Sequence, residues 1–363
     1  MPVIDLHDDK DFDSGTKAKL DIFENYLTEW LPTFLFNNSK VTICDFFSGP
    51  GEDICHNPGS PLRIFNVIEK FKDCIIDQNV KINVILNEQK KLKYETLQLN
   101  IRKKLDTLDN NFRNLIKAKI YNDDFQELFP QLELELIDGP NLFFFDQNGV
   151  KQVTVDFIKH LETFAKTDYL FFLSSSYFKR FGFEHLFPDL KIKKDDIEST
   201  EIHRTIVERL RESLQEGSKT KLYHFSIKKN RNIYGLVFGS THLLAVEKFL
   251  KVAWNKNKIN GEANFDIDRD LDTQLDLFSG QTQKATKIER FETELRIFAE
   301  QRKRFTNKEV FNYTLDKGFT PQHANEILRK LRDGRYLKHF SYPKIGYNQI
   351  YKSNDIVTFE YIK

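Results

Sequence analysis

Between residues 41 and 173, short apolar runs alternate with segments of helical periodicity, and this alternation constrains the fold more than any other feature. Five apolar runs have the length of buried strands, at residues 41–45, 82–86, 119–121, 142–145 and 169–173. Helical patterns lie between several of them, as at 89–105 and 150–166. Strands spaced by helices predict βαβ units in an α/β fold, with a mainly parallel sheet and helices on both faces.

The segments on either side of this region extend the prediction. Residues 16–36 have the periodicity of an amphipathic helix, and residues 176–220 are expected to form a charged helical insertion. Residues 222–227 and 233–238 then predict a hairpin, followed by a helix at 242–254. A parallel sheet that ends in such a hairpin resembles class I methyltransferases, so we expect a Rossmann-like domain of that class over residues 1–254.

The C-terminal third has a different organisation. Residues 255–286 are polar and weakly periodic, which predicts a linker. Residues 287–301 form one expected helix, Thr306 with Glu309 makes a capping box for a second, and Thr320 precedes a third. Two strands are expected at 336–340 and 349–352. Three helices followed by a β-wing predict a winged-helix domain over residues 287–363.

Composition excludes several classes of protein. The net charge of 363 residues is +1, so no global field draws the chain to nucleic acid or to a membrane. No apolar run approaches the roughly 20 residues of a membrane span, and the three cysteines lack a CxxC spacing. Cys55 and His56 are adjacent but have no companions at metal-ligand spacing. We therefore expect a cytoplasmic protein without a membrane partner or a metal site.

A glycine-rich loop follows the first predicted strand and is the main candidate for cofactor binding. Its sequence is Asp45-Phe46-Phe47-Ser48-Gly49-Pro50-Gly51, and Ser60 and Pro61 open the next helix, with Ser60 as the expected N-cap. Glycines let a ligand approach the backbone, and the helix N-terminus favours a carboxylate. S-adenosylmethionine carries a carboxylate and no phosphate, whereas the dinucleotide and Walker patterns are absent. The predicted contacts are Asp45, Phe47, Ser48, Gly49 and Gly51, although a Gly-x-Gly sequence is also an ordinary turn.

Three acidic residues follow the other predicted strands. Glu88, after the second strand, is expected to accept the ribose hydroxyls, and Asp123, after the third, the adenine amino group. Asp146, after the fourth, would lie beside the transferable methyl group and orient or deprotonate an acceptor. Each has a structural alternative: a helix-start acid for Glu88, a helix cap for Asp123 and an ordinary turn for Asp146.

The sequence also resembles the three-Cys-motif partner protein (TcmP) family. Residues 45–51 followed by Gly59-Ser60-Pro61 are similar to the family's Asp-x-Phe-x-Gly-Pro-Gly and Gly-Ser-Pro signature, and the turn at Asp146 resembles its Asp-Pro-x-Gly turn. The resemblance implies a methyltransferase-like fold and a partner protein with a radical-SAM-like three-cysteine motif. Gln147 stands where the family has proline, which separates this turn from the family pattern.

The sequence supports neither of the two standard chemistries of DNA-base methylation. The turn after Asp146 lacks the prolines and the aromatic residue of amino-methylating DNA enzymes, and no cysteine follows a proline, as cytosine C5 chemistry requires.

A local basic cluster gives a different indication of nucleic acid. Residues 287–363 carry 16 Lys and Arg against 10 Asp and Glu. Six basic residues gather on the third predicted helix and the wing, where they would meet phosphates of DNA or RNA: Arg329, Lys330, Arg332, Arg335, Lys338 and Lys344. The alternative is a winged helix that makes dimer or protein contacts.

Three functions are consistent with these patterns. The first is an S-adenosylmethionine-dependent methyltransferase-like protein that acts on or with nucleic acid. The second is a non-catalytic methyltransferase-like module that binds a partner protein and DNA. The third is a small-molecule or protein methyltransferase whose C-terminal domain serves only assembly.

Overall fold

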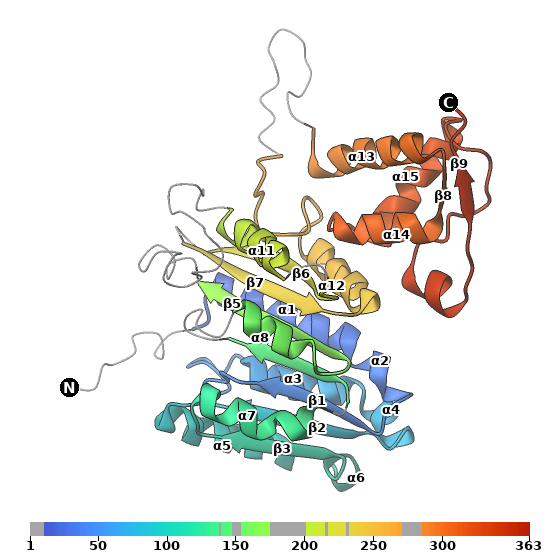
Figure 1. Ribbon diagram of the computed structural model, residues 1–363. Coiled ribbons are helices and arrows are strands. Elements are labelled where there is room, and N and C mark those ends of the chain that lie inside the picture. The colour runs from blue at the N-terminus through green and yellow to red at the C-terminus, as the bar shows by residue number, and fades with distance from the viewer. Residues whose placement is uncertain are drawn as a thin grey trace. The chain divides into compact units, whose positions relative to one another are not determined.

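The structure is a computed structural model that describes residues 11–137, 139–146, 154–174, 201–214, 217–229, 232–270 and 285–363 (Figure 1). The chain divides into two compact units, Met1–His242 and Leu243–Lys363. The predicted first domain extended to residue 254. In the structure, the helix that begins at Leu243 belongs to the second unit instead.

The first unit is built on a sheet of seven strands in the order β3-β2-β1-β4-β5-β7-β6. Strands β1 to β5 are parallel neighbours, whereas β7 is antiparallel to both β5 and β6. This order confirms the predicted class I methyltransferase sheet with its terminal hairpin. The strand bounds are β1 Lys40–Asp45, β2 Lys81–Asn87, β3 Ile116–Tyr121, β4 Asn141–Phe145, β5 Thr167–Ser174, β6 Lys221–Lys229 and β7 Asn232–Ser240.

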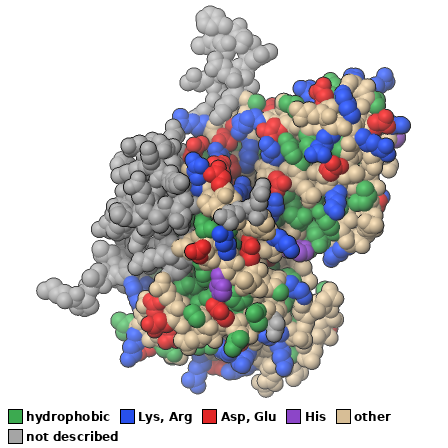
Figure 2. All heavy atoms as spheres, in the orientation of Figure 1, with side chains coloured by type: hydrophobic (Ala, Val, Ile, Leu, Met, Phe, Trp, Pro, Cys, Tyr) green, Lys and Arg blue, Asp and Glu red, His purple; other side chains and the backbone are tan. Residues whose placement is uncertain are grey.

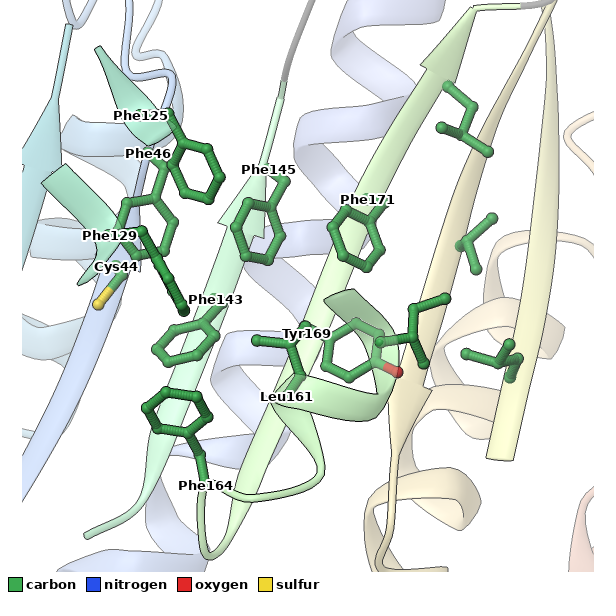
Figure 3. Packing of buried hydrophobic residues seen from close by; sticks show 14 of the residues in the cluster. Cys44, Phe46, Phe125, Phe129, Phe143, Phe145, Leu161, Phe164, Tyr169 and Phe171 are labelled. Carbon is green, nitrogen blue, oxygen red and sulfur yellow. The ribbon is translucent and has the colours of Figure 1, made fainter. Parts of the chain in front are cut away.

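Helices cover both faces of this sheet. On one face, α7 (Phe125–Leu136), α8 (Val155–Leu161) and α11 (Ile202–Ser213) enclose a core of aliphatic and aromatic side chains (Figure 3). On the other face, Phe23 of α1 (Ser14–Trp30) stacks on Phe144 with ring centroids 4.2 Å apart. There α3 (Ser60–Lys70) packs beside α1, and α5 (Lys91–Asp106) packs beside α3. The short helices are α2 Pro32–Leu35, α4 Lys72–Asp77 and α6 Asn110–Arg113.

Phenylalanine side chains pack closely against one another in this core. Phe46 lies among the rings of Phe125, Phe129, Phe143 and Phe145, with centroid separations of 5.2 to 5.7 Å (Figure 3). Edge-to-face and offset contacts at these distances are favourable. The residue directly after β1 is therefore fixed in the core, which anchors the glycine loop at its start.

The second unit contains the winged helix. Its helices are α12 Leu243–Lys256, α13 Lys287–Arg302, α14 Asn307–Asp316 and α15 Pro321–Asp333. The predicted capping box at Thr306 is confirmed, and Thr286 with Glu289 forms another at the start of α13. Three helices with a small sheet confirm the predicted winged-helix fold.

The strands of this small sheet differ from the prediction. β8 (Arg304–Thr306) pairs antiparallel with β9 (Thr358–Glu360), and Leu337 adds a single bridge to Tyr361. The expected strand at 336–340 is thus reduced to this bridge, and the one at 349–352 is a π-helix, Asn348–Lys352. Three-residue strands are too short to show an alternating pattern, and their pairing depends on residues far apart in the chain.

The segment predicted as a linker is partly folded. Asn260 is fully buried, and its amide donates to the carbonyl of Phe265 at 2.8 Å. Asp270 accepts from the backbone N–H of Lys287 at 2.7 Å, which joins the segment to α13. Residues 257–270 are therefore part of the second unit, and polar composition misled the prediction because the polar side chains bond to the backbone. Residues 271–284 lie outside the described part.

The predicted helical insertion is described only from residue 201 onward, where α11 lies. None of the helices in the described segments is long and apolar enough to cross a membrane.

Candidate active site

The glycine loop leaves the carboxyl end of β1 with two residues in the left-handed region. Gly49 has φ +62° and Gly51 has φ +94°, backbone conformations that residues with a Cβ atom rarely adopt. A Cβ on Gly51 would lie 3.3 Å from Leu97, whereas one on Gly49 would meet no described atom within 4 Å. The loop closes where the N–H of Gly59 donates to the carbonyl of Gly51 at 2.8 Å. Gly51 is thus packed, and Gly49 faces open space.

Ser60 does not cap α3 as predicted. Gly59 occupies the N-cap position, and the Ser60 hydroxyl donates to the carboxylate of Asp45 at 2.6 Å. Asp45 is fully buried, and burial raises its pKa to about 7, even though Ser60 acts in the opposite direction. The demand of this buried carboxylate for a donor explains why the serine side chain turns away from the helix end.

The side chains of Phe47 and Ser48 also face the interior. Phe47 packs on Phe125 with ring centroids 5.5 Å apart. The Ser48 hydroxyl donates to the carbonyl of Asp45 at 2.9 Å. The side chains of Asp45, Phe47 and Ser48 therefore support the loop from the protein interior. Gly49, by contrast, is an open position in the loop.

Glu88 lies directly after β2 and contacts the glycine loop. Its carboxylate accepts the N–H of Gly49 at 2.9 Å through one oxygen and the N–H of Lys90 at 2.7 Å through the other. The loop after β1 and the residue after β2 are therefore joined at one edge of the sheet, so the structure brings these two predicted site residues together.

Asn87, the last residue of β2, connects the loops on both sides of it. Its amide donates to the carbonyls of Phe46 at 3.2 Å and Asp123 at 3.1 Å, and its side-chain oxygen accepts the N–H of Asp123 at 3.1 Å. Its carbonyl also accepts the N–H of Ser48 at 2.9 Å. The sequence prediction missed Asn87. Its only signal was a polar residue at the end of a largely apolar strand.

Asp123 follows β3, and its carboxylate is exposed. The helix-capping role considered for this position belongs to the next residue, because Asp124 accepts the N–H of Gln126 at 2.8 Å at the start of α7. The backbone of Asp123 is held by Asn87, which leaves its side chain available at the same sheet edge.

Asp146 follows β4 and forms an ion pair that the sequence did not reveal. The ammonium group of Lys19, on α1, donates to its Oδ2 atom. Lys19 is nearly buried, and its nitrogen lies 4.3 Å from the centre of the Phe172 ring. Asp146 is the last described residue before the segment 147–153, so the predicted turn lies outside the described residues.

The loop between Gly51 and Gly59 is held by the N-terminal segment. The N–H of Phe12 donates to Asp53 at 2.8 Å, and the side chain of Asn57 donates to Asp11 at 2.7 Å. Arg63 of α3 donates to Asp21 of α1 at 2.9 Å. The residues before and within α1 therefore form part of the surroundings of the loop. Within the described residues, no group of three or more His, Cys, Asp or Glu side chains could hold a metal ion.

The six basic residues predicted to meet nucleic acid lie on α15 and after it. Four of them form ion pairs: Lys330 with Glu292, Arg332 with Asp333, Lys338 with Glu360 and Lys344 with Asp355. Arg329 lies over the ring of Tyr342 at 4.9 Å. Within the described residues, neither Arg329 nor Arg335 pairs with a carboxylate. On the face drawn in Figure 2, positive and negative side chains are interspersed.

Comparisons with known proteins give a family match within the second unit. Residues 262–340 match the family described as GMT-like wHTH domain. No curated protein matches the chain.

The chain is also similar to several solved structures, and for three of them the identity, the TM-score and the share of each chain covered are as follows. Trm1 from Pyrococcus horikoshii in complex with S-adenosyl-L-methionine shares 13% identity at a TM-score of 0.38, over 63% of this chain and 56% of that chain. The METTL16 MTase domain shares 12% identity at 0.30, over 61% and 66%. A putative class I S-adenosylmethionine-dependent methyltransferase, lmo1582 from Listeria monocytogenes, shares 8% at 0.31, over 63% and 62%. The alignments span less than two thirds of each of these chains, and the fold assignment rests on the strand order itself.

Proposed function

We propose that this protein is an S-adenosylmethionine-dependent methyltransferase-like protein that acts on or with nucleic acid. The observation that carries the proposal is the hydrogen bond between the Gly49 N–H and the Glu88 carboxylate. It joins an open glycine loop and an acidic side chain at the carboxyl edge of a parallel sheet, which is where α/β folds of this kind bind nucleosides.

The residues present fit such a cofactor. An ionised carboxylate offers about four acceptor positions, and Glu88 uses two of them for the N–H groups of Gly49 and Lys90. The remaining positions can accept the two ribose hydroxyls. The exposed carboxylate of Asp123 can accept from the adenine amino group, and the open space at Gly49 lets the ligand approach the loop backbone. When bound, the cofactor supplies the methyl group.

Asp146 is the residue that we assign to the methyl acceptor. It lies at the end of β4, which neighbours β1 in the sheet, and only its Oδ2 atom is engaged by Lys19. Within the described residues, Oδ1 carries no hydrogen bond. This oxygen can accept an N–H or O–H of the acceptor and so direct its lone pair.

The nucleic-acid part of the proposal rests on the winged helix. The third helix of such a fold is the one that enters a groove, and α15 with the wing carries the six basic residues named above. DNA and RNA remain alternatives, and the resemblance to TcmP proteins predicts in addition a partner with a radical-SAM-like three-cysteine motif. Methyl transfer to neither nucleic acid, together with cofactor binding, would favour the non-catalytic module.

Titration calorimetry with S-adenosylmethionine tests the cofactor site. We expect saturable binding by the intact protein and a loss of at least tenfold in affinity in Glu88→Ala, because two hydroxyl contacts and the loop anchor disappear together. Glu95→Ala is the matched control, since Glu95 is an exposed glutamate on α5. Absence of binding by the intact protein, or unchanged affinity in Glu88→Ala, would contradict the proposal.

A further inference from the structure

The ion pair between Lys19 and Asp146 links two parts of the chain that are far apart in sequence. Lys19 comes from the second turn of α1, and Asp146 follows the central strand β4. The lysine side chain is 9% exposed and the aspartate side chain 19%. The ring of Phe172, on β5, lies beneath the ammonium group. Within the part of the chain that the structure describes, the carboxylate is thus held from the helix side and through one of its oxygens.

This pair is not required to dock α1. Phe23 already stacks on Phe144, and the buried Tyr26 hydroxyl donates to Asp168 at 2.7 Å. Bringing an ammonium group out of water is costly, and a buried ion pair is often replaceable by apolar residues without loss of stability. A nearly buried lysine on an already anchored helix, next to the carboxylate that we assign to the acceptor, therefore points to a role in the site.

We propose that Lys19 is a positioning residue of the transfer site, which holds Asp146 through Oδ2 and compensates its charge. This inference rests on the proposed function. It makes α1 a part of the active centre rather than only a cover for the sheet. The two oxygens of the Asp146 carboxylate then have different roles. The lysine holds Oδ2, and Oδ1 accepts a hydrogen bond from the methyl acceptor.

The charge compensation has a consequence for ligand binding. The sulfonium group of S-adenosylmethionine is a cation, whereas the thioether of S-adenosylhomocysteine, the product, is neutral. The Lys19–Asp146 pair carries almost no net charge, so in the intact site the pair should add little to the preference for one compound over the other. Removal of either charge should change the ratio of the dissociation constants for the two compounds, because a partly buried charge is poorly screened.

The experiment measures the dissociation constants of both compounds for the full-length protein and its variants by calorimetry. Lys19→Met keeps an unbranched side chain over Phe172. In this variant the preference for S-adenosylmethionine should rise by roughly tenfold, since the negative charge of Asp146 is no longer compensated. In Asp146→Asn the preference should shift toward S-adenosylhomocysteine, because the ammonium group is then unpaired. Lys19→Arg keeps the positive charge and should therefore show the same preference as the intact protein.

The control is Lys17→Met, on the same helix, whose ammonium group lies 3.6 Å from the exposed Asp11. It should leave the preference unchanged. The two variants shift the preference in opposite directions, so Asp146→Asn still tests the idea if Lys19→Met fails to fold. Equal preferences in the intact protein, Lys19→Met and Asp146→Asn would overturn the inference while the proposed function stands. Failure of the intact protein to bind either compound would overturn both.

Discussion

The hydroxyl of Ser60 donates a hydrogen bond of 2.6 Å to the buried carboxylate of Asp45, and so ties the first turn of α3 to the end of β1. The chain between these two residues contains the glycine loop and the segment that leads from it to α3. The loop is therefore closed by one polar contact beneath it and by the Gly59 N–H on the Gly51 carbonyl. Any change in the ionisation of Asp45 acts on both ends of the loop at once.

The first prediction concerns the pH dependence of stability. Burial raises the pKa of Asp45 from 3.8 to about 7, so this group favours the folded state at low pH, and the contribution is lost as pH rises from about 4 through 7. Urea unfolding of the intact protein and Asp45→Asn at pH 4 and pH 8 should show the difference change by on the order of 4 kcal/mol. Parallel pH profiles would contradict it.

The second prediction has the opposite sign. Burial lowers the pKa of His203 from 6.5 to about 4, so its neutral form favours the folded state above pH 6.5, and this contribution is lost as pH falls toward 4. In His203→Leu, the decline in unfolding free energy over this range should be smaller by on the order of 3 kcal/mol. The measurement is again urea unfolding, and an identical decline in both proteins would exclude the assignment.

The third prediction concerns Gly235 in β7, on which the ring of His203 packs. A Cβ at Gly235 would lie 2.2 Å from the His203 ring, so Gly235→Ala should destabilise the first unit by about 1–3 kcal/mol or more. Thermal unfolding measures this change. His203→Ala in the Gly235→Ala background should recover part of the loss beyond additivity, and strictly additive effects would show that the two residues do not contact each other.

The fourth prediction tests Asn87 as the connection between the loops. Asn87→Ala removes both amide donors and the acceptor for the Asp123 N–H, and leaves the buried carbonyl of Phe46 without this donor at a cost of about 1–3 kcal/mol. We expect lower stability and roughly tenfold weaker binding of S-adenosylmethionine, measured by calorimetry. Asn83→Ala, at a buried polar position earlier in β2, is the control for strand stability alone. Equal losses of affinity in both variants would deny Asn87 a specific role.

The fifth prediction separates the basic residues of the winged helix. Because Lys330, Arg332, Lys338 and Lys344 already pair with carboxylates, Arg329 and Arg335 should provide the strongest phosphate contacts. Arg335→Ala should weaken binding to duplex DNA and lower the salt dependence, as a log–log slope, by about one. Fluorescence anisotropy over a salt series measures both.

Arg302→Ala, which removes an arginine paired with Glu309 on the preceding helices, should have little effect on this slope. A slope that is the same in the intact protein, Arg329→Ala and Arg335→Ala would exclude both residues from the interface.

Local patterns in the sequence predicted most of the helices and strands, and they identified polar residues that the fold brings together at one edge of the sheet. Apolar runs indicate strands where both faces are buried, as at 142–145, and parallel connection then brings the carboxyl ends of β1 to β5 to one edge. Glu88 and Gly49 could be assigned to one site for this reason alone. The capping box at Thr306 was likewise readable, because a cap depends only on residues three apart.

The tertiary structure decided which partners the polar side chains take. Ser60 has the sequence context of an N-cap but bonds to Asp45, since a buried carboxylate requires a donor that only the folded chain brings near. Lys19 is separated from Asp146 by 127 residues, and no periodicity relates them. The wing strands β8 and β9 are fixed in the same way, by long-range pairing of segments too short to carry a pattern. Local spacing in the sequence therefore determined most helices and strands of this protein. Contacts between distant residues decided which ion pairs and hydrogen bonds form at the candidate site.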